Sequence, residues 1–120
     1  IYLIRHSGPF VDLEYDYKIT FEEQSRNMIL TSTAEEKAEY LSNLSELNNI
    51  DRIYCSNSAR AIATAKYIAE KNNKKINVDN NFNERIFGVE YIEELPDNFI
   101  INQFKDDNYK SVAYLEGMSR

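Results

Sequence analysis

The sequence contains few of the residues on which disulfide-bonded and metal-binding proteins depend. It has one cysteine, Cys55, and one histidine, His6. A single cysteine cannot form a disulfide within the chain, and one cysteine with one histidine is too few for a structural zinc site. We therefore expect no bound metal, and nothing else in the sequence indicates a cofactor.

Long apolar runs and excess positive charge are also missing. No stretch approaches the roughly 18 apolar residues of a membrane-spanning helix, and no charged segment precedes an apolar stretch at the N-terminus, as it would in a secretory signal. The formal net charge of −6 argues against a surface for nucleic acid or anionic lipid, because such surfaces need excess Lys and Arg. We expect a soluble cytoplasmic domain with neither nucleic acid nor a membrane as partner.

The residues that are present suffice for one hydrophobic core. The chain has 120 residues, the length of one ordinary domain, and 42% of them are hydrophobic. An apolar run begins at Ile1 without an initiator methionine, and residues 114–120 read as a loop. We expect residues 1–120 to form a single domain that is a fragment of a longer one.

The pattern of apolar residues predicts alternating strands and helices. Residues 1–4 are all apolar and precede a turn, which is typical of a central parallel strand buried on both faces. Two further strands are predicted at 52–55 and 75–78, with one helix at about 33–47 and another after Ser58. The order strand, helix, strand, helix, strand favours a parallel sheet with right-handed crossovers.

Local signals predict where the helices begin and which sides they bury. Ser32 and Thr33 each stand three residues before a glutamate, the spacing of a capping box, and Ser56-Asn57-Ser58 supplies a turn and an N-cap for the later helix. Residues 10–30 read as a long connection with one helical turn, and 91–109 as two short helices. The apolar face of the later helix is predicted to consist of Ala61, Ile62, Ala65, Ile68 and Ala69.

Charged residues follow the predicted strands at their carboxyl ends. Arg5 and His6 leave the first strand, Arg60 lies in the first turn of the helix after the second, and Glu84 follows the third. Ligands of parallel α/β sheets bind at this edge, near helix N-termini that favour anions. Because each guanidinium can grip two oxygens, a pair of arginines suits a phosphoryl group.

Each of these residues also has an ordinary structural interpretation. A single histidine after a strand is commonly a hydrogen-bonded structural residue, Arg60 could be a solvated surface charge, and Glu84 is one of 20 acids. Cys55 reads as a small apolar strand residue, because nothing beside it lowers the pKa of its thiol. Only the convergence of Arg5, His6, Arg60 and Glu84 on one edge favours a binding site.

Four segments resemble motifs of the histidine phosphatase superfamily, also called phosphoglycerate mutase-like. Ile4-Arg5-His6-Ser7 resembles its Arg-His-Gly signature, with Ser7 where glycine is usual, and Leu30-Thr31 with Ala34 and Lys37-Ala38 resembles the start of its first helix. Residues 53–65, which read IYCSNSARAIATA, are similar to its Ser-Pro-Leu-x-Arg-Ala-x-Gln-Thr-Ala block, and Glu84-x-x-x-Gly88 is similar to its acid-plus-glycine segment. The four segments follow the family's order and span residues 1 to about 91.

The resemblance implies a fold and a mechanism. The fold would be a three-layer α/β/α arrangement with a mostly parallel central sheet, here incomplete at the C-terminus. The substrate would be a small phosphorylated molecule, with His6 as the nucleophile that forms a phosphohistidine. Arg5 and Arg60 would hold the phosphoryl oxygens, and Glu84 would protonate the leaving oxygen.

Departures from the family pattern leave three functions open. The chain has no second histidine, Asp12 stands where many members carry a phosphate-contacting asparagine, and Met118 replaces the acid of a Gly-Glu-Ser segment. We favour a cofactor-independent phosphomonoester hydrolase. A phosphoglycerate mutase fits less well, because residues 7–12 read SGPFVD instead of the mutase's Glu-Ser or Glu-Thr and Trp-Asn. A non-catalytic domain that binds a phosphorylated ligand or a protein is the third possibility.

Overall fold

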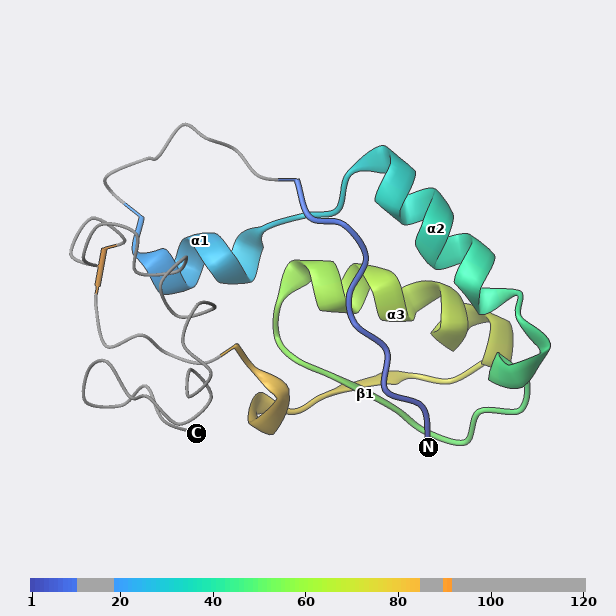
Figure 1. The fold of residues 1–120 in the computed structure, drawn as a ribbon. Coiled ribbons are helices and arrows are strands. Elements are labelled where there is room, and N and C mark those ends of the chain that lie inside the picture. Colours follow the sequence, from blue (N-terminus) through green and yellow to red (C-terminus); the bar gives the residue numbers. More distant parts are fainter. Residues whose placement is uncertain (11–18, 85–89, 92–120) are drawn as a thin grey trace, which may run out of the picture. The chain divides into compact units, whose positions relative to one another are not determined.

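The computed structural model describes residues 1–10, 19–84 and 90–91 (Figure 1). The chain divides into two compact units, one made of residues 1–14 and 25–83 and the other of residues 15–24 and 84–120. The sheet, the two longest described helices and the core all lie in the first unit. No helix of the described residues has both the length and the apolar character needed to cross a membrane.

Two parallel strands form the sheet of the first unit. β1 (Ile53–Cys55) pairs with β2 (Ile76–Val78), with Tyr54 opposite Asn77. Helix α3 (Ala59–Asn72) connects them, as a parallel pair requires. The structure confirms these two predicted strands and the α/β class; the three-layer arrangement stays a prediction.

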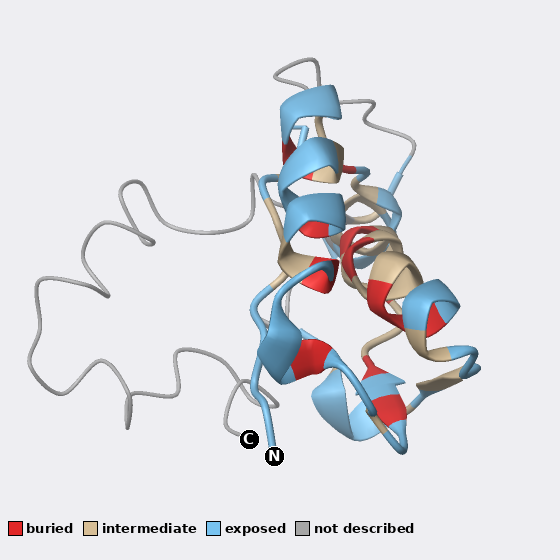
Figure 2. Cartoon of the chain, turned by 90° about the vertical axis from the view of Figure 1, so that its right-hand side faces the viewer, coloured by how far each residue is buried: buried red, intermediate tan, exposed pale blue. Residues whose placement is uncertain are grey.

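Two helices pack in succession over this sheet. α3 contacts both strands and also α2 (Ser32–Ser42), so that α3 lies between α2 and the strands in Figure 1. A 3₁₀ turn, η1 (Ser45–Leu47), follows α2. The core consists of Leu47, Ile53, Ile68 and Ala69, with Leu41, Ile50, Ala65 and Ile76 packed against it. Figure 2 shows buried residues on α2, α3 and β1.

Two predictions about α2 are wrong. The residue that caps it is Thr31, whose hydroxyl accepts a hydrogen bond from the Ala34 N–H at 3.2 Å, and neither Ser32 nor Thr33 is the cap. The helix ends at Ser42 instead of continuing to residue 47. The hydroxyl of Ser42 and the side-chain amide of Asn43 both donate to the Glu39 carbonyl, which gives the last turn a local partner in place of the next helical N–H.

The buried face of α3 also differs from the predicted one. It consists of Arg60, Thr64, Ile68 and Ala69, whereas Ile62 is exposed. The N-cap position is Ser58, within the predicted segment Ser56-Asn57-Ser58, although its hydroxyl pairs with that of Ser56 at 2.7 Å and not with a helix N–H. Ile68 and Ala69 are buried as predicted, and Ala65 packs against the core. Apolar character alone missed Arg60 and Thr64 because they are polar residues with hydrogen-bond partners inside the protein.

The N-terminal apolar run is not a strand, and this corrects the first predicted element. Leu3 is 92% exposed and Ile4 42%, and no strand is assigned to residues 1–4. The chain instead pairs further on, where Phe10 N–H donates to the Ile29 carbonyl and Thr31 N–H to the Gly8 carbonyl. An apolar run becomes a strand only where another segment offers its backbone groups, and β1 pairs with β2 alone among the described residues.

Two further expectations concern the connecting segments. Residues 10–30 were expected to hold one helical turn, and they contain α1 (Phe21–Asn27), a helix of seven residues. After β2 the chain forms a second 3₁₀ turn, η2 (Asn80–Phe82). The two helices predicted within 91–109 lie outside the described residues, apart from Tyr91.

Candidate functional site

His6 lies in the loop that follows the N-terminal run, and its ring is oriented by the backbone of the next residue, Ser7. The Nδ1 atom is 2.7 Å from the carbonyl oxygen of Ser7, and the side chain is half-buried. A carbonyl oxygen can only accept, so the hydrogen of this bond belongs to Nδ1. In the neutral imidazole the lone pair is then on Nε2, which is the nitrogen that can act as a nucleophile.

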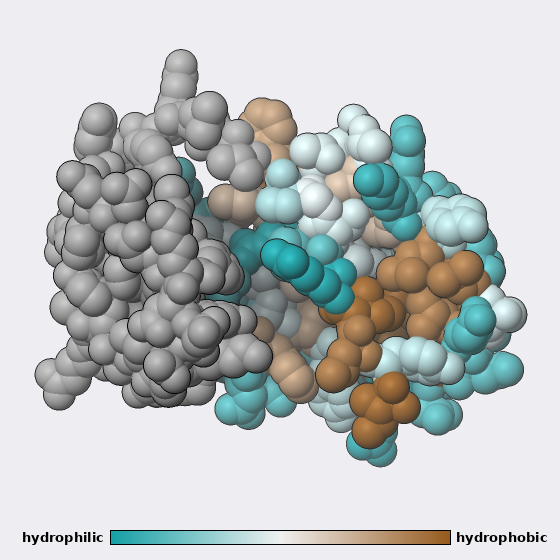
Figure 3. All heavy atoms as spheres, viewed as in Figure 1, coloured by the Kyte–Doolittle hydropathy of each residue, from teal (hydrophilic) through white to brown (hydrophobic). Residues whose placement is uncertain are grey.

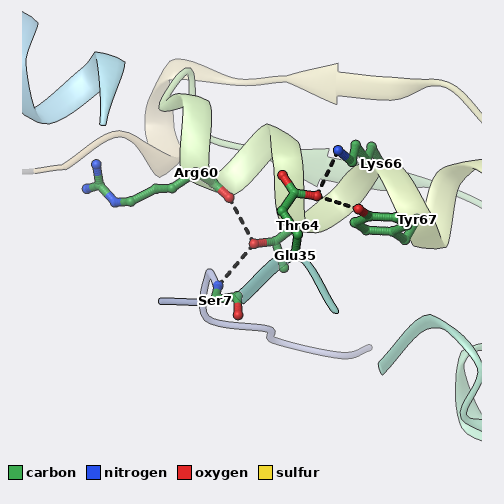
Figure 4. A network of polar contacts seen from close by, with 6 residues as sticks. All are labelled: Ser7, Glu35, Arg60, Thr64, Lys66 and Tyr67. Atoms are coloured by element: carbon green, nitrogen blue, oxygen red, sulfur yellow. Dashed lines mark hydrogen bonds and ion pairs between the residues drawn. The ribbon is translucent and has the colours of Figure 1, made fainter. Parts of the chain in front are cut away.

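The loop of His6 is attached to α3 through one hydroxyl group. Thr64 is 5% exposed, and its Oγ1 accepts a hydrogen bond from the Ser7 N–H at 3.0 Å. The same hydroxyl donates to the Arg60 carbonyl at 2.8 Å (Figure 4). The backbone of the His6 loop is therefore held against the first turns of α3.

Arg60 is buried, and its charged group points away from this hydroxyl. The residue is 6% exposed, and Figure 4 shows its side chain extending to the opposite side from Thr64. Its Nη1 donates to the Ser25 carbonyl. A buried guanidinium needs such partners, because an uncompensated charge would be costly to remove from water. The structure thus brings the Arg60 backbone close to the His6 loop and gives its guanidinium a protein partner that the sequence did not indicate.

The remaining predicted site residues are exposed. The side chain of Arg5 forms no hydrogen bond or ion pair with the part of the chain that the structure describes, and it directly precedes His6. Glu84 belongs to the second unit and immediately precedes the undescribed residues 85–89. Asp12 lies outside the described residues. The predicted joint action of Arg5, Arg60 and Glu84 with His6 stays a prediction.

Thr64 is the residue of this region that the sequence analysis missed. It stands four residues after Arg60, which places both on the same side of a helix, and it occupies the threonine position of the segment 53–65 that resembles the family block. That position was a usable signal. A threonine in a helix usually bonds only to its own preceding turn, and the bond to Ser7 is the contact that spacing cannot predict.

Cys55 is a buried strand residue, as predicted. Its side chain lies in β1, and desolvation raises the pKa of its thiol above the usual value. The thiolate, which is the reactive form, is therefore disfavoured. Among the side chains described, no group of three His, Cys, Asp or Glu could hold a metal ion.

A second polar contact joins α2 and α3 next to this region. The Glu35 carboxylate accepts a hydrogen bond from the Tyr67 hydroxyl and forms an ion pair with Lys66 at 2.8 Å (Figure 4). The Lys66 ammonium also lies 4.7 Å from the centroid of the Tyr67 ring. The hydrogen bond from Lys66 is the largest cause that lowers the pKa of Glu35, and the carboxylate in turn raises the pKa of both partners.

Comparison with known proteins identifies a family. The family model described as histidine phosphatase superfamily (branch 1) matches residues 1–113. No curated protein and no solved structure matches the chain significantly. The matched range includes Arg5, His6, Arg60, Thr64 and Glu84.

Proposed function

Because this chain belongs to the histidine phosphatase superfamily, whose chemistry is of the phosphatase and mutase type, we propose that it is a phosphomonoester hydrolase with His6 as its nucleophile. The single observation that carries the proposal is the bond from His6 Nδ1 to the Ser7 carbonyl. This bond places the lone pair of the neutral ring on Nε2, as nucleophilic attack requires.

In the proposed reaction His6 takes the phosphoryl group and then passes it to water. Nε2 attacks phosphorus, the N–P bond forms, and the bond from phosphorus to the ester oxygen breaks. The leaving oxygen takes a proton from Glu84 as general acid. A water molecule then attacks the phosphohistidine and gives one proton to the Glu84 carboxylate as general base, the N–P bond breaks, and inorganic phosphate, neutral His6 and protonated Glu84 are restored. The covalent intermediate divides one difficult displacement into two easier ones.

The arginines supply the positive charge in this proposal. Phosphoryl transfer depends mainly on positioning and on neutralising the phosphoryl oxygens. Arg5 is exposed beside His6 and has no ion pair among the described residues, which leaves its guanidinium available to an anion. Arg60 has its backbone next to the threonine that anchors the His6 loop, but its guanidinium donates to the Ser25 carbonyl. Its part in holding the phosphoryl oxygens therefore rests on the family resemblance. The proposed reaction needs no metal or other cofactor.

The test is to trap the covalent intermediate. The chain is incubated with an aryl phosphate labelled at phosphorus, and we expect one acid-labile, base-stable phosphate per chain, together with release of the phenol. His6→Ala should abolish both signals, whereas Arg52→Met, which removes an exposed cation elsewhere, should retain both. Full turnover by His6→Ala would refute the proposal.

The same experiment separates the alternatives. A phosphoglycerate mutase would also form the phosphohistidine but would pass the label to a phosphoglycerate acceptor instead of water. A non-catalytic domain would bind a phosphate analogue such as vanadate without forming the adduct. Either result would replace hydrolysis as the assigned function.

A further inference from the structure

We infer that Thr64 is a positioning residue for His6, because its hydroxyl holds the Ser7 backbone in the orientation that sets the tautomer of the imidazole ring. The inference concerns the structure of the His6 loop; its kinetic consequence rests on the proposed function. Three successive hydrogen bonds carry it. The bonds from Thr64 to the Arg60 carbonyl and from Ser7 N–H to Thr64 are drawn in Figure 4, and the third joins His6 Nδ1 to the Ser7 carbonyl.

The Thr64 hydroxyl donates to the Arg60 carbonyl, and this direction leaves the hydroxyl oxygen free to accept from Ser7. A hydroxyl has one hydrogen and two lone pairs. The hydrogen of Thr64 is used in the bond to the Arg60 carbonyl, which can only accept. A lone pair therefore remains for the Ser7 N–H, at 3.0 Å. One buried hydroxyl thus satisfies a donor from the loop and an acceptor from the helix at the same time.

The second bond fixes the residue whose carbonyl the histidine uses. Ser7 N–H is bound by Thr64, and the carbonyl of the same residue accepts from His6 Nδ1 at 2.7 Å. If the Ser7 backbone rotates, its carbonyl leaves Nδ1, and the Nε2–H tautomer, which has no nucleophilic lone pair at Nε2, can form instead. Thr64 therefore acts on the ring through one intervening residue without touching it.

Burial makes this anchoring hydroxyl hard for water to replace. Thr64 is 5% exposed, and Ser7 and His6 are half-buried. Removing the hydroxyl leaves the Ser7 N–H without its partner, and an unpaired polar group in a buried position favours movement of the loop. Thr64→Val has nearly the same shape but no hydroxyl, whereas Thr64→Ser keeps the hydroxyl and loses only the methyl group.

The single histidine of the chain allows a direct test. With ¹⁵N-labelled protein, the two imidazole nitrogens give one set of signals, and their shifts report which nitrogen carries the hydrogen. We expect the Nδ1–H tautomer in the native chain and in Thr64→Ser, and a shift toward Nε2–H in Thr64→Val. Circular dichroism and the backbone amide spectrum check that Thr64→Val is folded.

The effect of Thr64 on the reaction is measured by the kinetics of aryl phosphate hydrolysis. Thr64→Val should lower kcat at least tenfold with KM changed less than twofold, while Thr64→Ser stays within threefold of the native rate. A tenfold loss corresponds to about 1.4 kcal/mol of transition-state stabilisation. If Thr64→Val unfolds, the same tautomer and kcat comparison is made with Thr64→Ala.

The two possible failures are distinguishable. A folded Thr64→Val with the native tautomer and native kcat would overturn the role of Thr64. A native chain that neither hydrolyses the aryl phosphate nor forms the His6 adduct would overturn the proposed function instead, and the tautomer comparison would still decide whether Thr64 orients His6.

Discussion

At the scale of single residues, Asn72 shows how one side chain joins segments that are distant in sequence. Its Oδ1 accepts from the Ile50 N–H at 2.9 Å, and its Nδ2 donates to the carbonyls of Leu47 and Ile68 at 2.9 and 2.8 Å. The chain between η1 and β1 is thereby fastened to the last turn of α3. The segment fastened in this way carries Leu47, one of the residues of the hydrophobic core.

We expect Asn72→Ala to destabilise the fold by about 1–3 kcal/mol, because the Ile50 N–H and the Leu47 carbonyl each lose their partner. The measurement is urea unfolding, in which the midpoint should fall with an unchanged m-value. Asn48→Ala is the matched control: its side chain is exposed and forms no hydrogen bond with the described residues, so the change should stay within about 0.5 kcal/mol. Equal midpoints for the two variants would contradict this role of Asn72.

At the scale of elements, two kinds of contact hold α2 and α3 together: buried packing of small side chains, and a charged group of residues at the surface. The buried side of α2 presents Ala34, Ala38 and Ser42, whose small side chains allow close packing. The charged contact is Glu35 with Lys66 and Tyr67. Because Glu35 and Lys66 remain 31% and 42% exposed, this ion pair contributes only about 0.2–1 kcal/mol.

The lowered pKa of Glu35 predicts a pH dependence of stability. When the folded pKa lies below the unfolded one, the ionised carboxylate stabilises the fold above the unfolded pKa, and this contribution is lost as the pH falls through the folded pKa. The pKa values of Lys66 and Tyr67 are raised in the folded chain, so these two groups affect stability at high pH. Their stabilising contributions are present below the unfolded pKa and are lost as the pH rises through the folded pKa.

We therefore expect Glu35→Gln to lower the urea midpoint at pH 7 and to leave it close to the native value in strong acid, where the native carboxylate is protonated. Glu36→Gln, on the same helix and exposed, serves as control and should follow the native pH profile. Added salt should reduce the difference at pH 7, because exposed pairs are screened. A difference that persists undiminished in acid would show that the carboxylate charge is not its cause.

At the scale of the whole molecule, the described core lies between α3 and the two strands and not around the N-terminal run. Figure 3 shows apolar side chains gathered on the part of the surface where the N-terminal end lies in Figure 1. Ile1, Tyr2, Leu3 and Ile4 are all exposed. Their apolar surface contributes little to the stability of this chain, since burial is what stabilises.

A pair of alanine substitutions tests this position of the core. Ile68→Ala should destabilise by about 2–5 kcal/mol, because it leaves a cavity beside Leu47 and Ile53. Leu3→Ala should cost less than about 0.5 kcal/mol, because Leu3 is exposed. Thermal or urea unfolding measures both. A Leu3→Ala effect as large as that of Ile68→Ala would mean that residues 1–4 are buried, as their apolar pattern predicted.

Much of the local structure could be predicted from the sequence. β1, β2 and α3 lie where the pattern placed them, and α3 begins directly after the predicted turn Ser56-Asn57-Ser58. These features depend on neighbouring residues, whose propensities and hydrogen bonds act over a few positions. Arg5, His6 and Arg60 were singled out by the same means, through motifs that are contiguous in the chain.

The sequence by itself determined the α/β class, the parallel pairing with its helical crossover and the family to which the motifs point, because all three are encoded in local periodicity and in short motifs. Only the tertiary structure decided that residues 1–4 remain unpaired within the described chain, that the Arg60 guanidinium meets Ser25, and that Thr64 binds Ser7 across 57 positions. Such contacts depend on which buried donors and acceptors find each other once the elements pack, and residues far apart in the chain carry no sign of that pairing in their own neighbourhoods.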